Sequence, residues 1–195
     1  MSRLAATLMI GASLALVAAC DRTPEAPAEP EAPAETPAAP APADADLGAS
    51  ADLQALALTG TATAVSNTAM SITGDAAFDG ATIRFEEGIE LVTAPERISL
   101  TTSAYNETGQ TWAQLLQAPD DAQVEIRRVV SQSVSDRARN GGLCGSEEAP
   151  AETGYIALIH EGEDLMVAAF TAGEAPGPSA PEDALCGTYR YAFEG

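Results

Sequence analysis

The chain of 195 residues contains no lysine, a single histidine (His160) and a single tryptophan (Trp112). All nine basic residues are therefore arginines, and the 29 acidic residues outnumber them, for a formal net charge of −20. A surface this negative repels phosphate backbones and anionic lipid headgroups, which argues against nucleic-acid binding. It favours solubility, basic partners or divalent cations. Because aromatics make up only 5% of the chain, a core has to be built from small aliphatic side chains.

The first twenty residues are typical of an export signal. A short, positively charged start, Met1–Arg3, precedes an apolar run over Leu4–Ala19. The run is too short and too rich in alanine for a membrane span, which takes roughly 20 strongly apolar residues. It ends Val17–Ala18–Ala19–Cys20. This ending resembles the lipobox of bacterial lipoproteins, with valine at a position that is more commonly leucine.

The resemblance implies that Cys20 is diacylated, that residues 1–19 are removed as a signal peptide, and that the protein is anchored in the cell envelope, facing the periplasm. Two or three acyl chains make a stable anchor, at about 0.8 kcal/mol per buried methylene. An ordinary signal peptide with an incidental cysteine is the alternative. Asp21 is an inner-membrane signal in enterobacterial lipoproteins, but that rule does not extend to all Gram-negative bacteria. The choice between inner and outer membrane therefore stays open.

Residues 20–47 are expected to form a tether. Seven of the 27 residues after Cys20 are proline, and alanine and glutamate dominate the rest. The first four prolines recur every third residue, the period of the polyproline II helix. Such a segment has almost nothing to bury, so we expect it to be unfolded but stiff, reaching on the order of 80 Å at about 3.1 Å per residue. A single domain is then expected over 48–195.

Two of the three cysteines, Cys144 and Cys186, remain once Cys20 is assigned to lipid. Exported proteins meet an oxidising compartment, so these two are predicted to form a disulfide. Closing a loop of about 42 residues would contribute roughly 4 kcal/mol in the chain-entropy model. A zinc site is the alternative, but it needs two further ligands and His160 is the only imidazole. No metal and no cofactor is therefore expected.

Most of the domain shows strand patterns, and a mainly-β fold of about seven antiparallel strands, either a sandwich or a small barrel, is predicted. Turn residues at 87–88 and 161–164 predict two hairpins. One short helix is predicted over 111–117, because Thr111 is a good N-cap and Pro119 follows the stretch. Residues 53–58 are either a second short helix or the end of the tether. The strands are expected over 70–73, 82–86, 89–93, 98–104, 124–134, 155–159, 165–171 and 188–193.

Arg127 and Arg128 interrupt the longest predicted strand. If Val124, Ile126 and Val130 face the core, the period of two places Arg128 on that face as well. A β-bulge could turn it outward, a carboxylate could hold it in a structural ion pair, or it could line an anion pocket inside a barrel. Both arginines are therefore candidate ligand-binding residues.

No catalytic residue is assigned. His160 would need a nucleophile and an orienting group, and no nucleophile-elbow motif is present. The paired acids lack the alternating spacing of calcium loops and fall mostly in predicted turns.

These features favour a non-enzymatic binding module with a protein partner, in particular a basic envelope protein such as an inhibited hydrolase. Membrane-bound inhibitors of lysozyme resemble this architecture, since they too are small disulfide-bonded β lipoproteins, but their inhibitory-loop motif is absent here. A small-ligand carrier with a barrel interior, a hydrolase and a structural envelope protein are the alternatives. The oligomeric state is not indicated.

Overall fold

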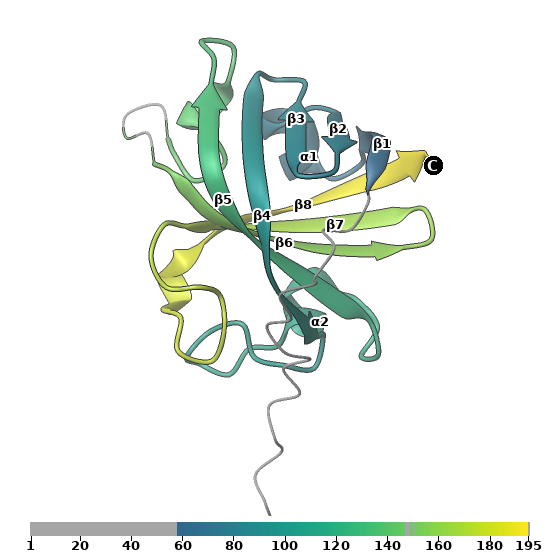
Figure 1. Cartoon of the computed structure of the whole chain (residues 1–195), viewed down its shortest axis with the longest axis vertical. Coiled ribbons are helices and arrows are strands. Elements are labelled where there is room, and N and C mark those ends of the chain that lie inside the picture. Colours follow the sequence, from purple (N-terminus) through teal and green to yellow (C-terminus); the bar gives the residue numbers. More distant parts are fainter. Residues whose placement is uncertain (1–57, 147–148, 150, 195) are drawn as a thin grey trace, which may run out of the picture. The chain divides into compact units, whose positions relative to one another are not determined.

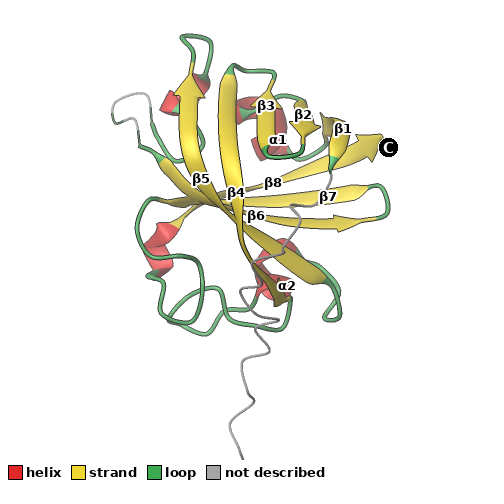
Figure 2. Cartoon of the chain, in the orientation of Figure 1, coloured by secondary structure: helices red, strands yellow, loops and turns green. Residues whose placement is uncertain are grey.

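A computed structural model describes residues 58–146, 149 and 151–194 (Figure 1). Within them, eight antiparallel strands pair in chain order, and the last strand pairs with the first to close a barrel (Figures 1 and 2). The strands are β1 (Thr59–Ala64), β2 (Ala76–Asp79), β3 (Thr82–Phe85), β4 (Ile89–Leu100), β5 (Gln123–Val134), β6 (Thr153–Glu161), β7 (Asp164–Thr171) and β8 (Leu185–Glu194). The mainly-β prediction is confirmed, and a barrel, not a sandwich, is the architecture. The predictions for Cys20, the signal peptide and the tether, and that for residues 53–58 apart from Leu58, concern residues outside the described part.

Both predicted hairpins are present, as β3–β4 and β6–β7. The segments 89–93 and 98–104, predicted as separate strands, largely join into the single 12-residue strand β4, with residues 101–104 beyond its end. The prediction of a strand over 70–73 was wrong, because Asn67–Ile72 forms helix α1. The Ser66 side chain caps it by accepting a hydrogen bond from the Ala69 amide at 3.1 Å. Strands β1 and β2 were not predicted.

The predicted helix is confirmed as α2 (Trp112–Leu116). Thr111 and Gln114 form a reciprocal capping box, and Gln117 ends the helix in the left-handed conformation with φ 54°. Two single-turn 3-10 helices, Arg139–Gly141 and Glu182–Ala184, lie in the connecting loops. Among the described helices, none is both long and apolar enough to span a bilayer.

Side chains fill the barrel interior. Seven of the strands contribute buried apolar residues that pack on one another, and β5 contributes Glu125, Arg127 and the partly buried Val129. Members of this inner core include Ala62, Phe78, Ile83, Phe85, Leu91, Ile156, Leu158, Leu165, Val167, Tyr189, Tyr191 and Phe193. Burial raises the pKa of Tyr189 to about 12 and raises that of Tyr191 as well. The interior is therefore a packed core and not a ligand chamber lined by these residues.

A second core lies on the outer face of β5, β6 and β7. The residues that alternate with those of the inner core, such as Ile126, Ala157 and Ala168, pack beneath α2 and the loop that leads into it. Trp112 is fully buried there, with its ring 5.5 Å from that of Tyr105 and 5.7 Å from that of Phe170. Strands covered on both faces explain why β6 and β7 are continuous apolar runs rather than alternating ones.

The predicted disulfide is confirmed. Cys144 and Cys186 are bonded, with their Cα atoms 4.8 Å apart, and they join the long loop between β5 and β6 to the start of β8. The Tyr189 hydroxyl also donates a hydrogen bond, of 3.2 Å, to the Leu143 carbonyl beside the bridge. The loop is thus held against β8 both covalently and by a hydrogen bond.

Candidate functional site

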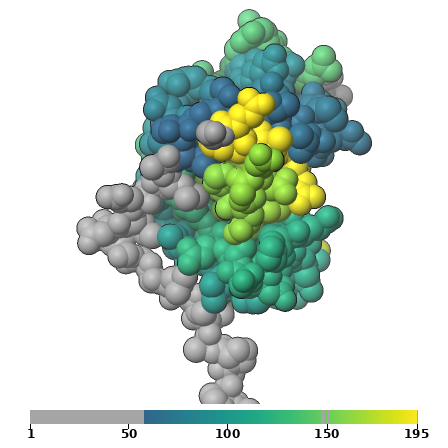
Figure 3. All heavy atoms as spheres, turned by 90° about the vertical axis from the view of Figure 1, so that its right-hand side faces the viewer, coloured from purple at the N-terminus to yellow at the C-terminus, as the bar shows by residue number. Residues whose placement is uncertain are grey.

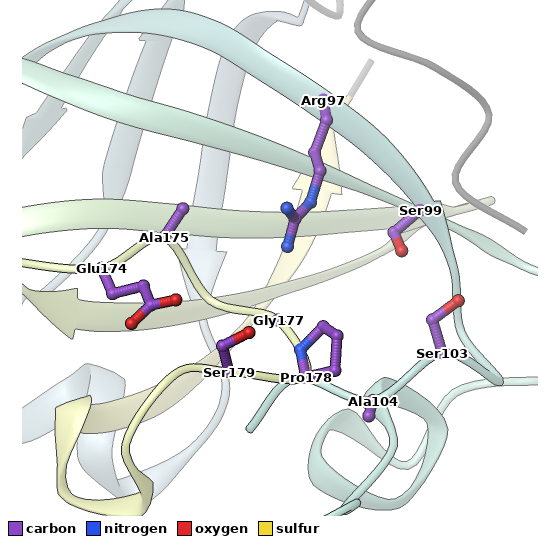
Figure 4. Close-up of a pocket in the computed structure, with 9 residues that line it drawn as sticks. All are labelled: Arg97, Ser99, Ser103, Ala104, Glu174, Ala175, Gly177, Pro178 and Ser179. Atoms are coloured by element: carbon purple, nitrogen blue, oxygen red, sulfur yellow. The ribbon is translucent and has the colours of Figure 1, made fainter. Parts of the chain in front are cut away.

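A cavity of about 290 Å³ lies outside the barrel, between β4 and the proline-rich loop before β8 (Figure 4). Its polar lining includes one guanidinium, one carboxylate and three hydroxyl groups, and its apolar lining consists of small side chains. The lining residues are Arg97, Ser99, Ser103, Ala104, Glu174, Ala175, Gly177, Pro178 and Ser179. The volume is close to the lower end, about 300 Å³, of small-molecule sites. We refer to it as the Arg97 pocket.

Backbone hydrogen bonds hold the loop in place to form the pocket wall. The Gly177 amide donates to the Tyr105 carbonyl at 2.8 Å, and the Glu107 amide donates to the Ala180 carbonyl, also at 2.8 Å. The Arg97 guanidinium donates to the Pro176 carbonyl. These bonds tie residues 176–180 to the segment that follows β4, so the two walls of the pocket have a defined spacing.

A β-bulge aims Arg97 toward this wall. Pro95 pairs with Arg127 on β5, whereas Arg97 pairs with Ile126, so one extra residue, Glu96, is accommodated on β4. A bulge bends its strand and redirects the side chains that follow it. Figure 4 shows the Arg97 side chain extending from β4 toward the loop. Ser99 and Ser103 line the same cavity.

Arg97, like Arg137, Arg139 and Arg190, forms no ion pair within the part of the chain that the structure describes. Within the described residues, Arg84, Arg127 and Arg128 each form an ion pair with a glutamate, whereas no carboxylate oxygen lies within 4.0 Å of the Arg97 guanidinium. Glu174 lines the same pocket but stays beyond this distance. A guanidinium has five N–H groups, and the Pro176 carbonyl uses only one of those of Arg97. Arg97 can therefore still offer two parallel donors to an anion.

Hydrolytic chemistry has little support in this pocket. A serine nucleophile needs an adjacent general base, and the chain's single histidine lines two other cavities. The described residues also contain no group of three or more His, Cys, Asp or Glu side chains arranged to hold a metal ion. The donors present, a guanidinium and hydroxyls, are suited to holding a carboxylate.

Arg127 and Arg128 lie on opposite faces of β5. Val124 and Ile126 face the second core, on the outside of the barrel. Val130 is on the same strand beyond the end of that core, and it is 57% exposed. Arg128 shares the outer face, its side chain is 55% exposed, and its Nε lies 3.6 Å from Glu96. Arg128 therefore lies on the face of Val124 and Ile126, as the period of two predicts, and of the alternatives considered for it the outward-turned side chain is the one present.

Arg127, by contrast, is fully buried in the barrel interior. Its Nε lies 3.0 Å from Oε1 of Glu125, and its Nη2 donates to Oε2 at 3.1 Å, so the pair is bidentate. Its Nη1 donates to the Gly80 carbonyl at 2.8 Å and lies 3.5 Å from the Thr93 hydroxyl. The guanidinium thus connects β5 to β4 and to the β2–β3 turn. The buried ion pair on this strand is thus formed by Arg127, whereas the ion pair of Arg128 with Glu96 is exposed.

His160 lies at the end of β6, with its ring 5.0 Å from that of Phe193 in an edge-on arrangement. One neighbouring cavity lies between the β6–β7 turn and the end of β8, two segments that are side by side on the face drawn in Figure 3. The Nε2 atom of His160 is buried and has no hydrogen-bond partner among residues 58–146, 149 and 151–194. No serine or cysteine lines either cavity beside it. The site therefore offers His160 no nucleophile to activate.

The sequence did not lead to the Arg97 pocket. A proline inside a strand pattern is typical of a bulge or an edge, and Pro95 just before Arg97 was the signal available. The loop residues that complete the pocket begin at Glu174, which lies 77 positions after Arg97 in the chain. No periodicity within either segment connects them.

Comparison with known proteins does not assign the chain to a family. No family model matches it, and neither the search of curated proteins nor that of solved structures gives a match.

Proposed function

We propose that the chain is a lipid-anchored envelope protein with a non-enzymatic binding domain. The lipobox-like ending at Cys20 supports the anchor, and the Pro/Ala/Glu-rich segment that follows supports a spacer between membrane and domain. The Cys144–Cys186 disulfide fits export to an oxidising compartment.

The domain binds a small anionic ligand, a carboxylate, in the Arg97 pocket. The observation that carries this proposal is the guanidinium that faces a cavity with no carboxylate within 4.0 Å in the described part of the chain. Of the seven arginines in residues 58–146, 149 and 151–194, three form ion pairs and four do not, so what distinguishes Arg97 is its place in the lining of the cavity. Three serine hydroxyls on the same walls can donate further hydrogen bonds.

The alternatives have less support. The barrel interior is packed, and Arg127 is already paired with Glu125, which leaves a carrier little room inside the barrel. The hydrolase alternative lacks a base beside the serines of the Arg97 pocket.

A basic protein partner remains a second candidate, because residues 48–195 carry 22 acids against seven arginines. Binding of that kind would weaken steeply as salt is raised. Binding that does not change with salt would count against it.

Propionate is a suitable probe of the pocket, because it is a carboxylate with a short apolar chain. We would measure its binding to the full lipidated chain in detergent by saturation-transfer NMR, with Arg97→Gln as the test variant. A charged hydrogen bond contributes about 1.5–3 kcal/mol, so Arg97→Gln should weaken binding about tenfold or more. Arg84→Gln is the matched control, because Arg84 is exposed and paired with Glu90 at 2.8 Å. Equal binding by Arg97→Gln and the natural chain would refute the assignment.

A further inference from the structure

The Arg97 pocket contains one polar side chain that is buried but has no partner. Among the polar residues that line the pocket, Ser99 alone is buried, with 7% of its surface exposed. Its hydroxyl forms no hydrogen bond within the part of the chain that the structure describes. The oxygen is not among the unpaired polar atoms that are sealed from solvent, so it still reaches open space. The Ser99 hydroxyl therefore opens into the cavity and needs a hydrogen-bond partner there.

Ser99 and Arg97 lie on the same face of β4. Arg97 pairs with Ile126 and Ser99 pairs with Val124, two residues that both belong to the outer core, and the register between these pairs is continuous. Side chains two positions apart on a strand share one face, with their Cα atoms about 7 Å apart. Figure 4 shows both side chains on the side of β4 that faces the proline-rich loop. One small ligand can therefore contact both residues.

The unpaired hydroxyl determines which substituent suits this ligand. A carboxylate that binds the Arg97 fork with both oxygens leaves Ser99 facing the carbon chain next to it. An apolar chain would leave the Ser99 hydroxyl without a hydrogen bond, which is unfavourable in a buried position. A hydroxyl group on the ligand can both donate to Ser99 and accept from it. A second carboxylate is disfavoured, because Arg97 is the one basic residue that lines the pocket and the net charge of the chain is −20.

We propose that the ligand is a short hydroxycarboxylate and that Ser99 selects for its hydroxyl group. The carboxylate lies on the Arg97 guanidinium, and the ligand hydroxyl forms a hydrogen bond with the Ser99 hydroxyl. Ala104 and Pro178 provide an apolar wall for the remaining carbon atoms. The inference rests on the proposed carboxylate site and adds to it the recognition of a second group.

The test compares ligands that differ only in that hydroxyl, the two enantiomers of lactate and propionate. Each is titrated onto the full lipidated chain in detergent and followed by saturation-transfer NMR. We expect at least one lactate enantiomer to bind about threefold to tenfold more tightly than propionate, the range for a neutral hydrogen bond. Ser99→Ala should abolish this difference while propionate binds at least as well as before. The urea midpoint of Ser99→Ala should change little, because the hydroxyl holds no other described residue in place.

Ser179→Ala is the matched control, because Ser179 lines the same pocket but is exposed, so water can satisfy its hydroxyl. It should leave the preference for lactate unchanged, and loss of the preference in this variant would overturn the assignment to Ser99. If propionate binds through Arg97 but neither lactate binds better, or the preference persists in Ser99→Ala, the hydroxycarboxylate inference is wrong and the carboxylate site stands. If none of the three ligands binds, both proposals fail.

Discussion

Replacing Arg127 by leucine should strongly destabilise the barrel. The side chain is fully buried, and it holds the 6%-exposed Glu125 side chain by a bidentate contact. Without the guanidinium, the carboxylate stays in the interior without this counter-ion, and the Gly80 carbonyl loses a charged donor. Removing one partner of a buried ion pair costs about 3–5 kcal/mol. The loss is a large part of the total stability of a small domain, which is on the order of 5–15 kcal/mol.

The double variant Arg127→Leu/Glu125→Leu separates the pair from simple packing. Two apolar side chains remove the isolated carboxylate, so we expect the double variant to be more stable than the single one. Recovery should be incomplete because the Gly80 carbonyl still lacks its donor, which costs about 1–3 kcal/mol. Arg128→Leu, one residue away and exposed, is the matched control and should change stability by about 0.5 kcal/mol or less.

Urea unfolding at pH 7 provides the measurement, with the fluorescence of Trp112 as the signal. Trp112 is the only tryptophan and is fully buried, so its emission should shift to longer wavelength on unfolding. Two results would refute the argument. One is a loss below about 1 kcal/mol for Arg127→Leu, which would mean that the pair is not desolvated. The other is a double variant whose loss of stability equals the sum of the losses measured for Arg127→Leu alone and Glu125→Leu alone. Such additivity would mean that the two residues act independently.

Two further predictions concern the pocket loop and the tyrosines. Gly177→Ala should weaken propionate binding, because the new Cβ would displace the guanidinium of Arg97. The urea midpoint should change little, since only the flexible end of that side chain has to move. Unchanged binding would show that the close approach of Gly177 to Arg97 is not needed. Burial raises the pKa of Tyr189 from 10.0 to about 12, so its neutral form stabilises the fold fully below pH 10. That contribution, at most about 3 kcal/mol, is lost as the pH rises from 10 to 12. Urea midpoints at pH 9, 10 and 11 should fall less steeply in Tyr189→Phe, and equal slopes would contradict the shift.

Local patterns in the sequence were sufficient for many of the elements. The β3–β4 and β6–β7 hairpins followed from apolar runs that flank glycine-containing turns, and α2 followed from the Thr111 cap. The disulfide followed from counting cysteines in an exported chain. The hairpins and the helix depend on residues that are close in sequence, and the disulfide depends on the redox state of the compartment. None of these predictions requires knowledge of the strand order.

The missed elements are those whose sequences are weak on their own. The sequences TGTATA of β1 and AAFD of β2 have little β-branched or aromatic content, and these strands form because their edges pair with β8 and β3. Helix α1 carries Ile72 and a methionine in a stretch that also fits a strand, and the Ser66 cap decides for a helix. Tertiary pairing and capping outweigh propensity in such short segments.

The sequence by itself determined the class of fold, the covalent bridge, the acidic charge and, through the resemblance at Cys20, the expected anchor. Only the tertiary structure decided which face of β5 each arginine occupies, because a strand covered on both sides shows no alternation from which to choose. It also decided the pocket. Arg97 and Glu174 are 77 residues apart in sequence, and only the bulge in β4 and the loop bonded to Tyr105 bring them to one cavity.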